Sequence, residues 1–306
     1  MCELSSSISI IIPVYNAVSF ISILFDSLDI QTIYPFEIIV IDSESEDSTA
    51  NIARTAGCRV QSIRKQDFNH GGTRNLGASM AKGDIIVFMT QDAILANPHA
   101  LQAIIEPFND PQVGAVCGRQ LPHKNANPLA SHARLFNYPA SSCTKTKADI
   151  PRLGIKVPFI SNSFAAYRKS ALQEIGGFPE HVILSEDMCA AARMILAGYS
   201  IVYAGNATVY HSHNYTPMQE FHRYFDIGAF HSQEAWIQET FGGAGGEGLR
   251  YVRSELAYAY KHGWYWVLRS LFTCLLKLVG YKLGKWESRL PKVCKRWLSM
   301  NKGFWE

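Results

Sequence analysis

An acidic residue, Asp92, follows the hydrophobic run that opens the stretch "DIIVFMTQDAIL", residues 84–95. A carboxylate can ligate Mg²⁺ or Mn²⁺, which take oxygen or imidazole ligands and borrow the rest of their coordination from phosphates and water. Asp92 could therefore hold a metal that is bound to a pyrophosphate. A solvated acid at the end of a strand would leave the same pattern, and position alone does not separate the two interpretations.

A pair of acids, Glu186 and Asp187, opens a predicted helix. Acids in a first helical turn stabilise the helix dipole by about 0.3 to 1 kcal/mol without any catalytic duty. The same position also keeps a carboxylate ionised at neutral pH, as a general base requires. The pair is therefore either a candidate catalytic base or an ordinary helix start.

Histidines occur on the alternating stretch "ATVYHSHNYT", where the period of two places Val209, His211 and His213 on one face. Imidazole is a common metal ligand. His211 could share a metal with Asp92 if the two lie close together. Otherwise it is a partly exposed strand residue.

The stretch "FNHGGTRNLGA" combines two glycines with a cation at a predicted helix start. Gly71 and Gly72 permit close backbone approach, and Arg74 and Asn75 follow them. Helix starts attract anions, and the guanidinium group matches phosphate oxygens. This corner is a weak candidate for binding a phosphate.

The elements that would position these side chains are three apolar, β-branched runs, residues 8–17, 36–45 and 84–93. Such runs are typical of parallel strands that are covered on both faces. Helices are predicted between and after them, so the order is βαβαβ. These helices cover residues 19–28, residues 48–56 with Asp47 as N-cap and Gly57 past the end, and residues 73–81 closed by Gly83.

The carboxyl ends of the parallel strands should carry the site. In an open sheet they line the ligand crevice, so we expect Val14, Asp42 and Asp92 to face one cleft. Asn97 and Pro98 supply the N-cap and the first position of the next predicted helix, so Asp92 is not needed as a cap.

Residues 119–158 are rich in Pro, Asn, Ser, Lys and His and show weak periodicity, which predicts a long loop region beside the site. A strand and a helix beginning near Lys169 or Ser170 follow it. A second helix, with Ser185 as N-cap and Gly198 at its end, leads into a further strand.

The composition is that of an ordinary soluble chain. The 306 residues are 47% hydrophobic and 18% charged, which is enough for a sizeable core. Seven cysteines without a CxxC pair predict neither a disulfide framework nor a zinc site and fit a reducing cytosol. The start of the sequence has no basic n-region, so we expect no signal peptide. No GxGxxG and no GxxxxGK[ST] motif occurs, which argues against a binding site for a dinucleotide or a nucleoside triphosphate.

The C-terminal part differs in charge from the rest. The Gly-rich stretch 241–248 predicts a joint, so we divide the chain into residues 1–241 and a helical region, residues 242–306. From residue 250 onward there are 12 Lys and Arg against 3 Glu, while the preceding part has 17 basic and 23 acidic residues. Trp and Tyr interleave with these cations, a mixture that suits a lipid headgroup region.

One helix of this region is predicted to be amphipathic. A helix needs about 20 mainly apolar residues to span a bilayer. The apolar run of this helix is shorter, and cations interrupt it. We therefore expect an interfacial helix; the alternative is a helix that packs on the main domain with solvated cations. The apolar face carries Leu268, Leu271, Phe272, Leu275, Leu276 and Val279, and another face carries Arg269, Thr273 and Lys277.

Five motifs, in their order and separations, resemble the family 2 glycosyltransferases with the GT-A fold. They are "SIIIPVYNA", "IVIDSESEDST", "FMTQDA", "SEDM" and "VYHSHN", and the resemblance covers residues 8–236. Within the family, "FNHGGTRNLGA", "SNSFAAYRKSAL" and the basic aromatic tail look most like bacterial rhamnosyltransferases that build O-antigen or other surface polysaccharides. The implied fold is a Rossmann-like three-layer α/β sandwich with a mainly parallel sheet, carrying a C-terminal helical extension.

The resemblance also implies residue roles. Asp187 would be the general base, with Glu186 beside it. Asp92 would be the surviving carboxylate of the DxD metal motif, with Thr90 in place of the first Asp, and His211 a further ligand of Mg²⁺ or Mn²⁺ or a diphosphate contact. Thr90, and Ser43 in place of a common second Asp, leave metal dependence open. The nucleotide and its diphosphate would be held by Pro13, Val14, Tyr15, Asp42, Arg74, Asn75 and Gln91.

The implied reaction is an inverting transfer of L-rhamnose from dTDP-β-L-rhamnose to a hydroxyl of a glycan linked to polyprenyl diphosphate. Such an acceptor would place the protein on the anionic, inner face of a bacterial cell membrane. No nucleic-acid partner is expected, and a homo-oligomer is left open. Three alternatives are another UDP- or dTDP-sugar donor, a sugar-phosphate nucleotidyltransferase and an inactive membrane-bound scaffold. The second would want a Gly-rich loop after the first strand, which "PVYNAVSF" does not supply.

Overall fold

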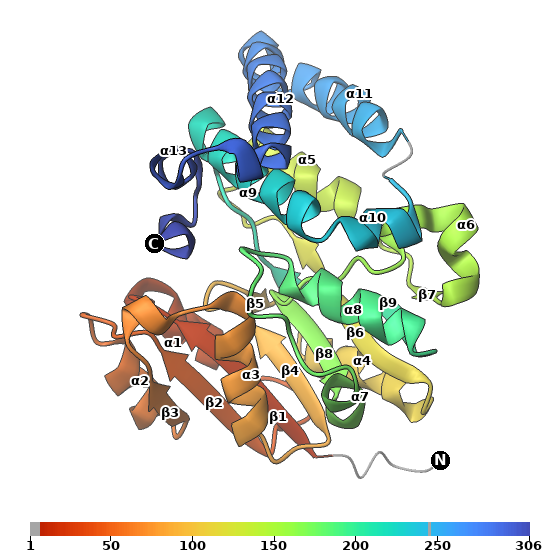
Figure 1. Ribbon diagram of the computed structural model, residues 1–306. Helices are drawn as coiled ribbons and strands as arrows, with labels where there is room; N and C mark the ends of the chain where they lie inside the picture. The colour runs from red at the N-terminus through yellow and green to blue at the C-terminus, as the bar shows by residue number, and fades with distance from the viewer. Residues whose placement is uncertain (1–6, 244–245) are drawn as a thin grey trace.

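The computed structural model describes residues 7–243 and 246–306 and shows a three-layer α/β body with helices stacked above it (Figure 1). Within these residues one nine-stranded sheet has the order β3-β2-β1-β4-β8-β6-β9-β5, with β7 paired to β9. The strands are β1 (Ile8–Val14), β2 (Glu37–Asp42), β3 (Arg59–Ser62), β4 (Ile85–Met89), β5 (Ile94–Leu95), β6 (Val113–Leu121), β7 (Cys143–Lys145), β8 (Phe164–Arg168) and β9 (Ser200–Tyr210).

The first four strands pair in parallel, as the three apolar runs predict, and β8 is inserted antiparallel between β4 and β6. Successive residues of β1 face opposite sides of the sheet. Ile10 and Ile12 join the hydrophobic core beneath α1 (Val18–Asp29) and α4 (Ala100–Ile105). Ile11 joins the core beneath α3 (His70–Met80) and α8 (Glu186–Leu196), so both faces are covered.

Two helix starts differ from the predicted ones by more than one residue. Helix α3 begins three residues early, because the Asn69 side chain accepts a hydrogen bond from Gly72 N (2.8 Å) and caps it. Helix α4 begins at Ala100 with His99 as its N-cap residue, so the predicted cap at Asn97 and Pro98 was wrong. Asn97 instead closes a turn on His99 N (2.9 Å) and donates to Thr208 Oγ1 (2.7 Å).

The predicted loop at residues 119–158 was also wrong. This stretch holds the end of β6, α5 (Pro128–Asn137), β7 and α6 (Ile150–Leu153). Asn127 caps α5 by accepting from Ala130 N (3.0 Å), with Pro128 in its first turn. Asn127 and Pro128 are usual helix-start residues, but the Pro, Asn, Ser and His content of this stretch is also typical of a loop.

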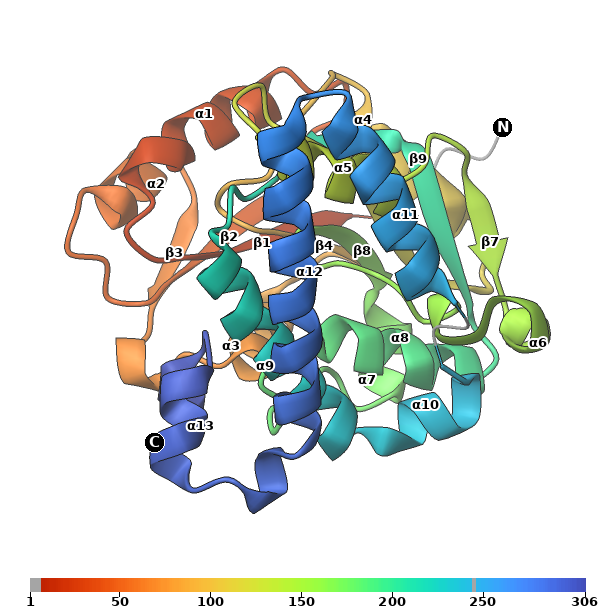
Figure 2. The ribbon, with the colours of Figure 1, turned by 90° about the horizontal axis from the view of Figure 1, so that it is seen from above.

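The helices after β9 pack on the α/β body and on one another. Helix α12 lies along α9, and α11 lies beside α12 and contacts α5 (Figure 2). A Cβ on Gly284 of α12 would lie 2.0 Å from Phe225 O of α9, so only glycine allows this approach. These helices are α9 (Pro217–Gln233), α10 (Ala235–Phe241), α11 (Glu247–Tyr260), α12 (Trp264–Lys285) and α13 (Lys292–Leu298).

Helix α12 has the two predicted faces, but its polar face packs on the protein and its apolar face is exposed. Its polar and small residues face the protein: Thr273, Lys277 and Gly280 are buried. Its apolar residues face outward: Leu268 is 65% exposed and Phe272 55%. None of the helices in the described part of the chain has the length and apolar content needed to cross a bilayer.

Candidate active site

The loops that follow β1, β2 and β4 meet at one edge of the sheet. The Gln91 side chain ties two of them together, because its Oε1 accepts from Tyr15 N (2.8 Å) and its Nε2 donates to Tyr15 O (3.2 Å). Val14 O accepts from Ser43 N (3.0 Å), which joins the ends of β1 and β2. Pro13 lies within β1, opposite Ile41 of β2.

Asp42 ends β2 and is buried, yet only half of its carboxylate is used. Its Oδ2 accepts from Ser45 N (3.3 Å), while Oδ1 and the neighbouring Ser43 Oγ have no hydrogen-bond partner among the described residues. Two residues nearby, Asn16 and Glu44, adopt positive φ angles of 46° and 55°. Orphaned buried oxygens and strained loops are typical of ligand sites, where a bound group supplies the missing donors.

A second cluster joins Asp92, His211 and His213, whose ligand atoms all lie within 4.8 Å of one another. Asp92 Oδ1 is 3.5 Å from His211 Nε2, and Asp92 Oδ2 is 3.7 Å from His213 Nε2. The strands explain this proximity. Ile94 of β5 pairs with Tyr210 of β9, which brings the residues before one strand beside those after the other.

The charges in this cluster suit a metal site. Burial would raise the pKa of Asp92, but His211 and His213 hold it below its ordinary value. Burial lowers the pKa of His211 to about 3 and also lowers that of His213. The cluster therefore presents a carboxylate and two neutral imidazoles at neutral pH, the protonation states in which these groups ligate metals.

Gln120 of β6 fixes the proton on His211. Its Oε1 lies 2.9 Å from His211 Nδ1 and also accepts from Arg134 Nη1 of α5 (2.8 Å). An amide oxygen only accepts, so Nδ1 must carry the hydrogen. The lone pair of Nε2 then faces Asp92.

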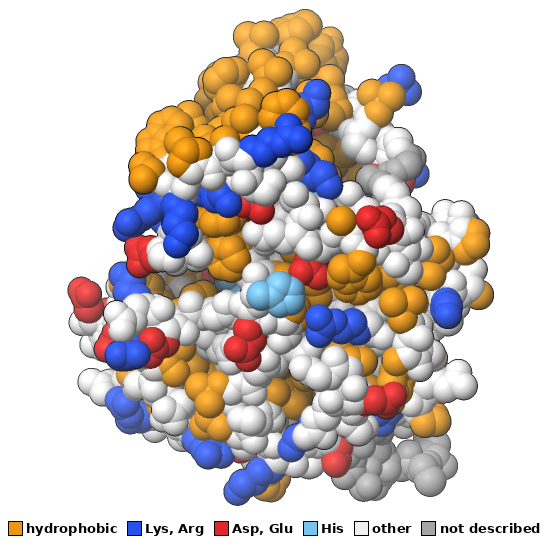
Figure 3. All heavy atoms as spheres, in the orientation of Figure 1, with side chains coloured by type: hydrophobic (Ala, Val, Ile, Leu, Met, Phe, Trp, Pro, Cys, Tyr) orange, Lys and Arg blue, Asp and Glu red, His pale blue; other side chains and the backbone are white. Residues whose placement is uncertain are grey.

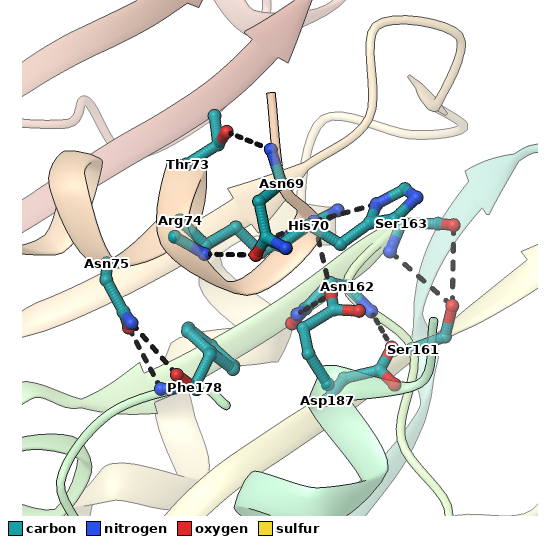
Figure 4. A network of polar contacts seen from close by, with 12 residues as sticks. Asn69, His70, Thr73, Arg74, Asn75, Ser161, Asn162, Ser163, Phe178 and Asp187 are labelled. Atoms are coloured by element: carbon teal, nitrogen blue, oxygen red, sulfur yellow. Dashed lines mark hydrogen bonds and ion pairs between the residues drawn. The ribbon is translucent and has the colours of Figure 1, made fainter. Parts of the chain in front are cut away.

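Both acids of the pair lie in the first turn of α8 and differ in environment. Figure 4 shows Asp187 beside Asn162 and Ser161. Glu186 is buried against Arg74 Nη1 (3.1 Å) and accepts from Asn162 Nδ2 (3.0 Å). Burial would raise the pKa of Glu186, but Arg74 and His70 hold it below its ordinary value. Glu186 is therefore a fixed internal anion.

Asp187 is partly exposed and poised near neutrality. Its Oδ2 accepts from Asn162 N (2.9 Å) and its Oδ1 from Met188 N (2.8 Å). Burial, and then the negative charge of Glu186, raise the pKa of Asp187 to about 7. A carboxylate with such a pKa is well matched to proton abstraction near neutral pH.

One chain of hydrogen bonds connects the two clusters. Asn162 contacts both acids of the pair, and the adjacent Ser161 Oγ accepts from Gln120 Nε2 (2.9 Å). Gln120 in turn holds His211. Segments that lie far apart in the sequence thus form one polar site. They are the segments that follow β4 and β9, the segment that precedes β8, and the start of α8.

Arg74 and Asn75 lie in the second turn of α3, not at its start, which corrects the predicted anion corner. The glycine before them serves the protein itself, because a Cβ on Gly71 would lie 2.0 Å from Pro179 O. Asn75 donates to Phe178 O (2.9 Å) and accepts from Phe178 N (2.9 Å). Contact of either side chain with a nucleotide stays a prediction.

The other residues of the site differ in how clearly the sequence indicates them. The alternation of β9 already placed His213 beside His211, although His213 was not assigned as a ligand. Gln120, Arg134 and Asn162 have no such signal, because hydrogen bonds across the fold select them.

The model of "Glycosyl transferase family 2" matches residues 9–176. The O-antigen chain rhamnosyltransferase RfbN of Salmonella typhimurium is 54% identical over 300 residues, covering 97% of this chain and 96% of that protein. The O-antigen chain rhamnosyltransferase WbaN of Salmonella anatum is 53% identical over 301 residues, covering 98% and 96%.

Solved structures share the fold at low identity. The mannosyltransferase PcManGT from Pyrobaculum calidifontis, in complex with GDP-Man and Mn²⁺, superposes with a TM-score of 0.62 at 18% identity, covering 92% of this chain and 88% of that one. Staphylococcus aureus TarS 1–349 superposes with a TM-score of 0.51 at 16% identity, covering 92% and 91%. The predicted GT-A-type α/β fold is confirmed.

Proposed function

The chain belongs to glycosyltransferase family 2, and from this premise we propose that it transfers L-rhamnose from dTDP-β-L-rhamnose to a glycan in the synthesis of a surface polysaccharide. The observation that carries the proposal is the near full-length match, at 54% and 53% identity, to two O-antigen chain rhamnosyltransferases. The match extends through the C-terminal helices, beyond residues 9–176 that the family model matches.

Asp187 is the proposed general base. It would take the proton from an acceptor hydroxyl as that oxygen bonds to the anomeric carbon and the bond from this carbon to the diphosphate oxygen breaks. Attack opposite the departing dTDP inverts the centre and yields an α-L-rhamnoside. Glu186 and Asn162 are positioning residues: the first raises the pKa of Asp187, and the second orients its carboxylate.

Asp92, His211 and His213 would hold a divalent cation. One carboxylate oxygen and two imidazoles fit Mn²⁺ or a similar transition ion better than Mg²⁺, which prefers oxygen ligands. When bound, such an ion would neutralise the charge that grows on the leaving diphosphate. Gln120 would orient His211 for this purpose.

The strand ends that precede the cluster would hold the nucleotide. Asp42 Oδ1 is a buried acceptor without a partner in the described chain and suits an N–H of the base. The backbone of Pro13 and Val14, together with Tyr15, which Gln91 fixes, would flank the base. Arg74 and Asn75 would act indirectly, through Glu186 and the segment at Phe178.

The outward face of α12 would lie on a membrane. Hydrophobic side chains gather over α12 at the top of the molecule, and Lys and Arg side chains lie in a band beneath them (Figure 3). An exposed apolar helix above a basic zone fits the interface of an anionic bilayer. Residues 1–241 would then be the catalytic domain and residues 242–306 the part that docks on the inner face of the cell membrane, where a polyprenyl-diphosphate-linked acceptor would reside.

The test is incubation of the full chain with a panel of nucleotide sugars and a lipid-linked glycan acceptor, with and without EDTA. We expect transfer from dTDP-rhamnose alone and a loss of rate with EDTA that Mn²⁺ restores. Transfer from another UDP- or dTDP-sugar would replace the donor and keep the reaction class. Transfer of a nucleotide to a sugar phosphate would favour a nucleotidyltransferase instead.

A further inference from the structure

A cavity of about 1500 Å³ opens beside the metal cluster and runs between the α/β body and the C-terminal helices. His213 lines its inner end. Leu275 and Leu278 of α12 and Val252 of α11 line its outer part. The cavity therefore connects the place where the donor diphosphate would lie with the helices that carry the exposed apolar face.

Arg223 of α9 stands apart from the other cations of this cavity. Its side chain is exposed to the cavity, and among the described residues no hydrogen bond or ion pair of its guanidinium is found. It lines the same cavity as His213 of the metal cluster. Tyr215 stacks on His213 with 5.0 Å between ring centroids and lines the same wall.

The remaining cations of the wall already have partners. Lys277 lies 3.5 Å from Glu220 Oε1 and over the rings of Tyr224 and Tyr251. At the far side, Glu247 takes both Lys156 and Arg250. Arg134 is held by Gln120 (2.8 Å).

A guanidinium group that lines a cavity and makes no ion pair in the described chain is available to bind a phosphate group. Arg matches phosphate oxygens with two parallel N–H donors, and a concave protein wall strengthens the attraction relative to open water. Burial would lower the pKa of Arg223, but Glu220 on the same helix holds it above its ordinary value, and the same carboxylate lies 3.5 Å from Lys277. The cavity and the positive charge of Arg223 together fit an anionic ligand.

We propose that this cavity is the acceptor site, that Arg223 binds the phosphate which joins the acceptor glycan to its lipid, and that the apolar wall formed by α11 and α12 receives the first part of the hydrocarbon chain. The ligand class is a diphosphate ester of a long apolar alcohol. The inference rests on the proposed glycosyl transfer for the identity of the reaction, but the binding itself does not require a sugar donor.

The experiment measures binding of farnesyl diphosphate to the full chain by calorimetry, in saturating dTDP and Mn²⁺ so that the donor site is filled. We expect one molecule to bind, with inorganic pyrophosphate and farnesol each binding at least tenfold more weakly. Arg223→Gln should raise the Kd for farnesyl diphosphate about 10- to 100-fold, the range of a charge-assisted hydrogen bond. Arg250→Gln, on the same cavity wall but paired with Glu247, should change it less than threefold.

Several results would overturn the assignment. The first is that farnesyl diphosphate does not bind to the wild type. The second is that inorganic pyrophosphate or farnesol binds as tightly as farnesyl diphosphate. The third is that Arg223→Gln leaves the Kd for farnesyl diphosphate unchanged. A loss of dTDP affinity in Arg223→Gln would move the residue to the donor site. Failure of the proposed function is distinguishable, because it would appear as no sugar transfer in the donor panel while farnesyl diphosphate still binds.

Discussion

In the α/β body, the residues of β1 at positions 10, 11 and 12 are isoleucines with no exposed surface. In α12 the arrangement is reversed, since Ser270 and Thr273 are buried while Leu268 and Trp264 are 65% and 68% exposed. The α11–α12 pair even buries a carboxylate, Glu255, which accepts from Ser270 Oγ (2.6 Å) and Tyr251 OH (2.6 Å). Apolar side chains are thus buried in β1 but exposed on α12, where polar side chains are buried instead.

The two regions therefore differ in which side chains they keep from water. A body in water gains by removing apolar surface from it, at roughly 25 cal/mol per Å². Large contiguous apolar surfaces on a protein instead indicate a partner or a membrane. The reversed sorting of α12 supports the proposal that its outer face contacts a membrane, and substitutions in each region test that proposal.

The largest effect is expected from Asp187→Asn in the body. Loss of a general base should lower kcat by about 10²- to 10⁴-fold. Donor affinity and vesicle binding should not change, because neither uses this carboxylate. Turnover with dTDP-rhamnose, together with dTDP calorimetry and vesicle sedimentation, measures all three. A variant that also leaves the membrane would contradict the separation of the two regions.

Gln120→Ala should weaken Mn²⁺ binding about 10- to 100-fold, the usual cost of removing a group that orients a metal ligand. The physical reason is that His211 loses the acceptor that holds its proton on Nδ1. Electron paramagnetic resonance of free Mn²⁺ measures the affinity. Gln66→Ala, an exposed glutamine of the same body, is the matched control and should bind Mn²⁺ as the wild type does.

Leu268→Ser on α12 should raise the Kd for vesicles with anionic lipids roughly tenfold, the lower end for withdrawing one leucine side chain from an apolar phase. Ile23→Ser, which changes an exposed apolar residue of α1 in the body, should have no effect. Co-sedimentation measures both. Equal losses in the two variants would show that apolar exposure as such, and not the face of α12, drives the binding.

The sequence predicts the strands of the α/β body more completely than the packing of the C-terminal helices. Continuous β-branched runs revealed β1, β2 and β4, because a parallel strand buried on both faces leaves a strong pattern. The period of α12 was also readable, but its orientation was not, since a helical period shows that two faces exist and not which of them faces the protein. The sequence does not single out α5, because the Pro, Asn, Ser and His content around Asn127 and Pro128 is as typical of a loop as of a helix start.

The site shows the same limit. Asp92, Asp187 and His211 were found from a strand end, a helix start and an alternating strand. Their connection through Asn162 and Gln120 depends on long-range hydrogen bonds that leave no local pattern. The same is true of Arg223, whose significance lies in the partners it lacks within the described structure.

The smallest effect is expected on the pH dependence of kcat, when one acid of a buried ion pair is replaced in each region. Arg74–Glu186 in the body lies beside the proposed base, and Lys277–Glu220 holds α12 to α9. Glu186 raises the pKa of Asp187, whose value is about 7, so kcat should rise as pH increases through neutrality and the base loses its proton. Glu186→Gln removes the negative neighbour, so this rise should move to lower pH and the ratio of rates at pH 6 and pH 8 should increase a few-fold.

Glu220→Gln supplies the matched change in the other region. It leaves Lys277 without its carboxylate and should lower the melting temperature, but the pH at which kcat rises should stay in place, because no charge near Asp187 changes. The measurement is kcat from pH 5.5 to 8.5 for both variants. A shift in both, or in Glu220→Gln alone, would mean that the base is not coupled to Glu186 as the geometry implies. Charge buried in the body would then have the same purely structural task as charge buried beneath α12.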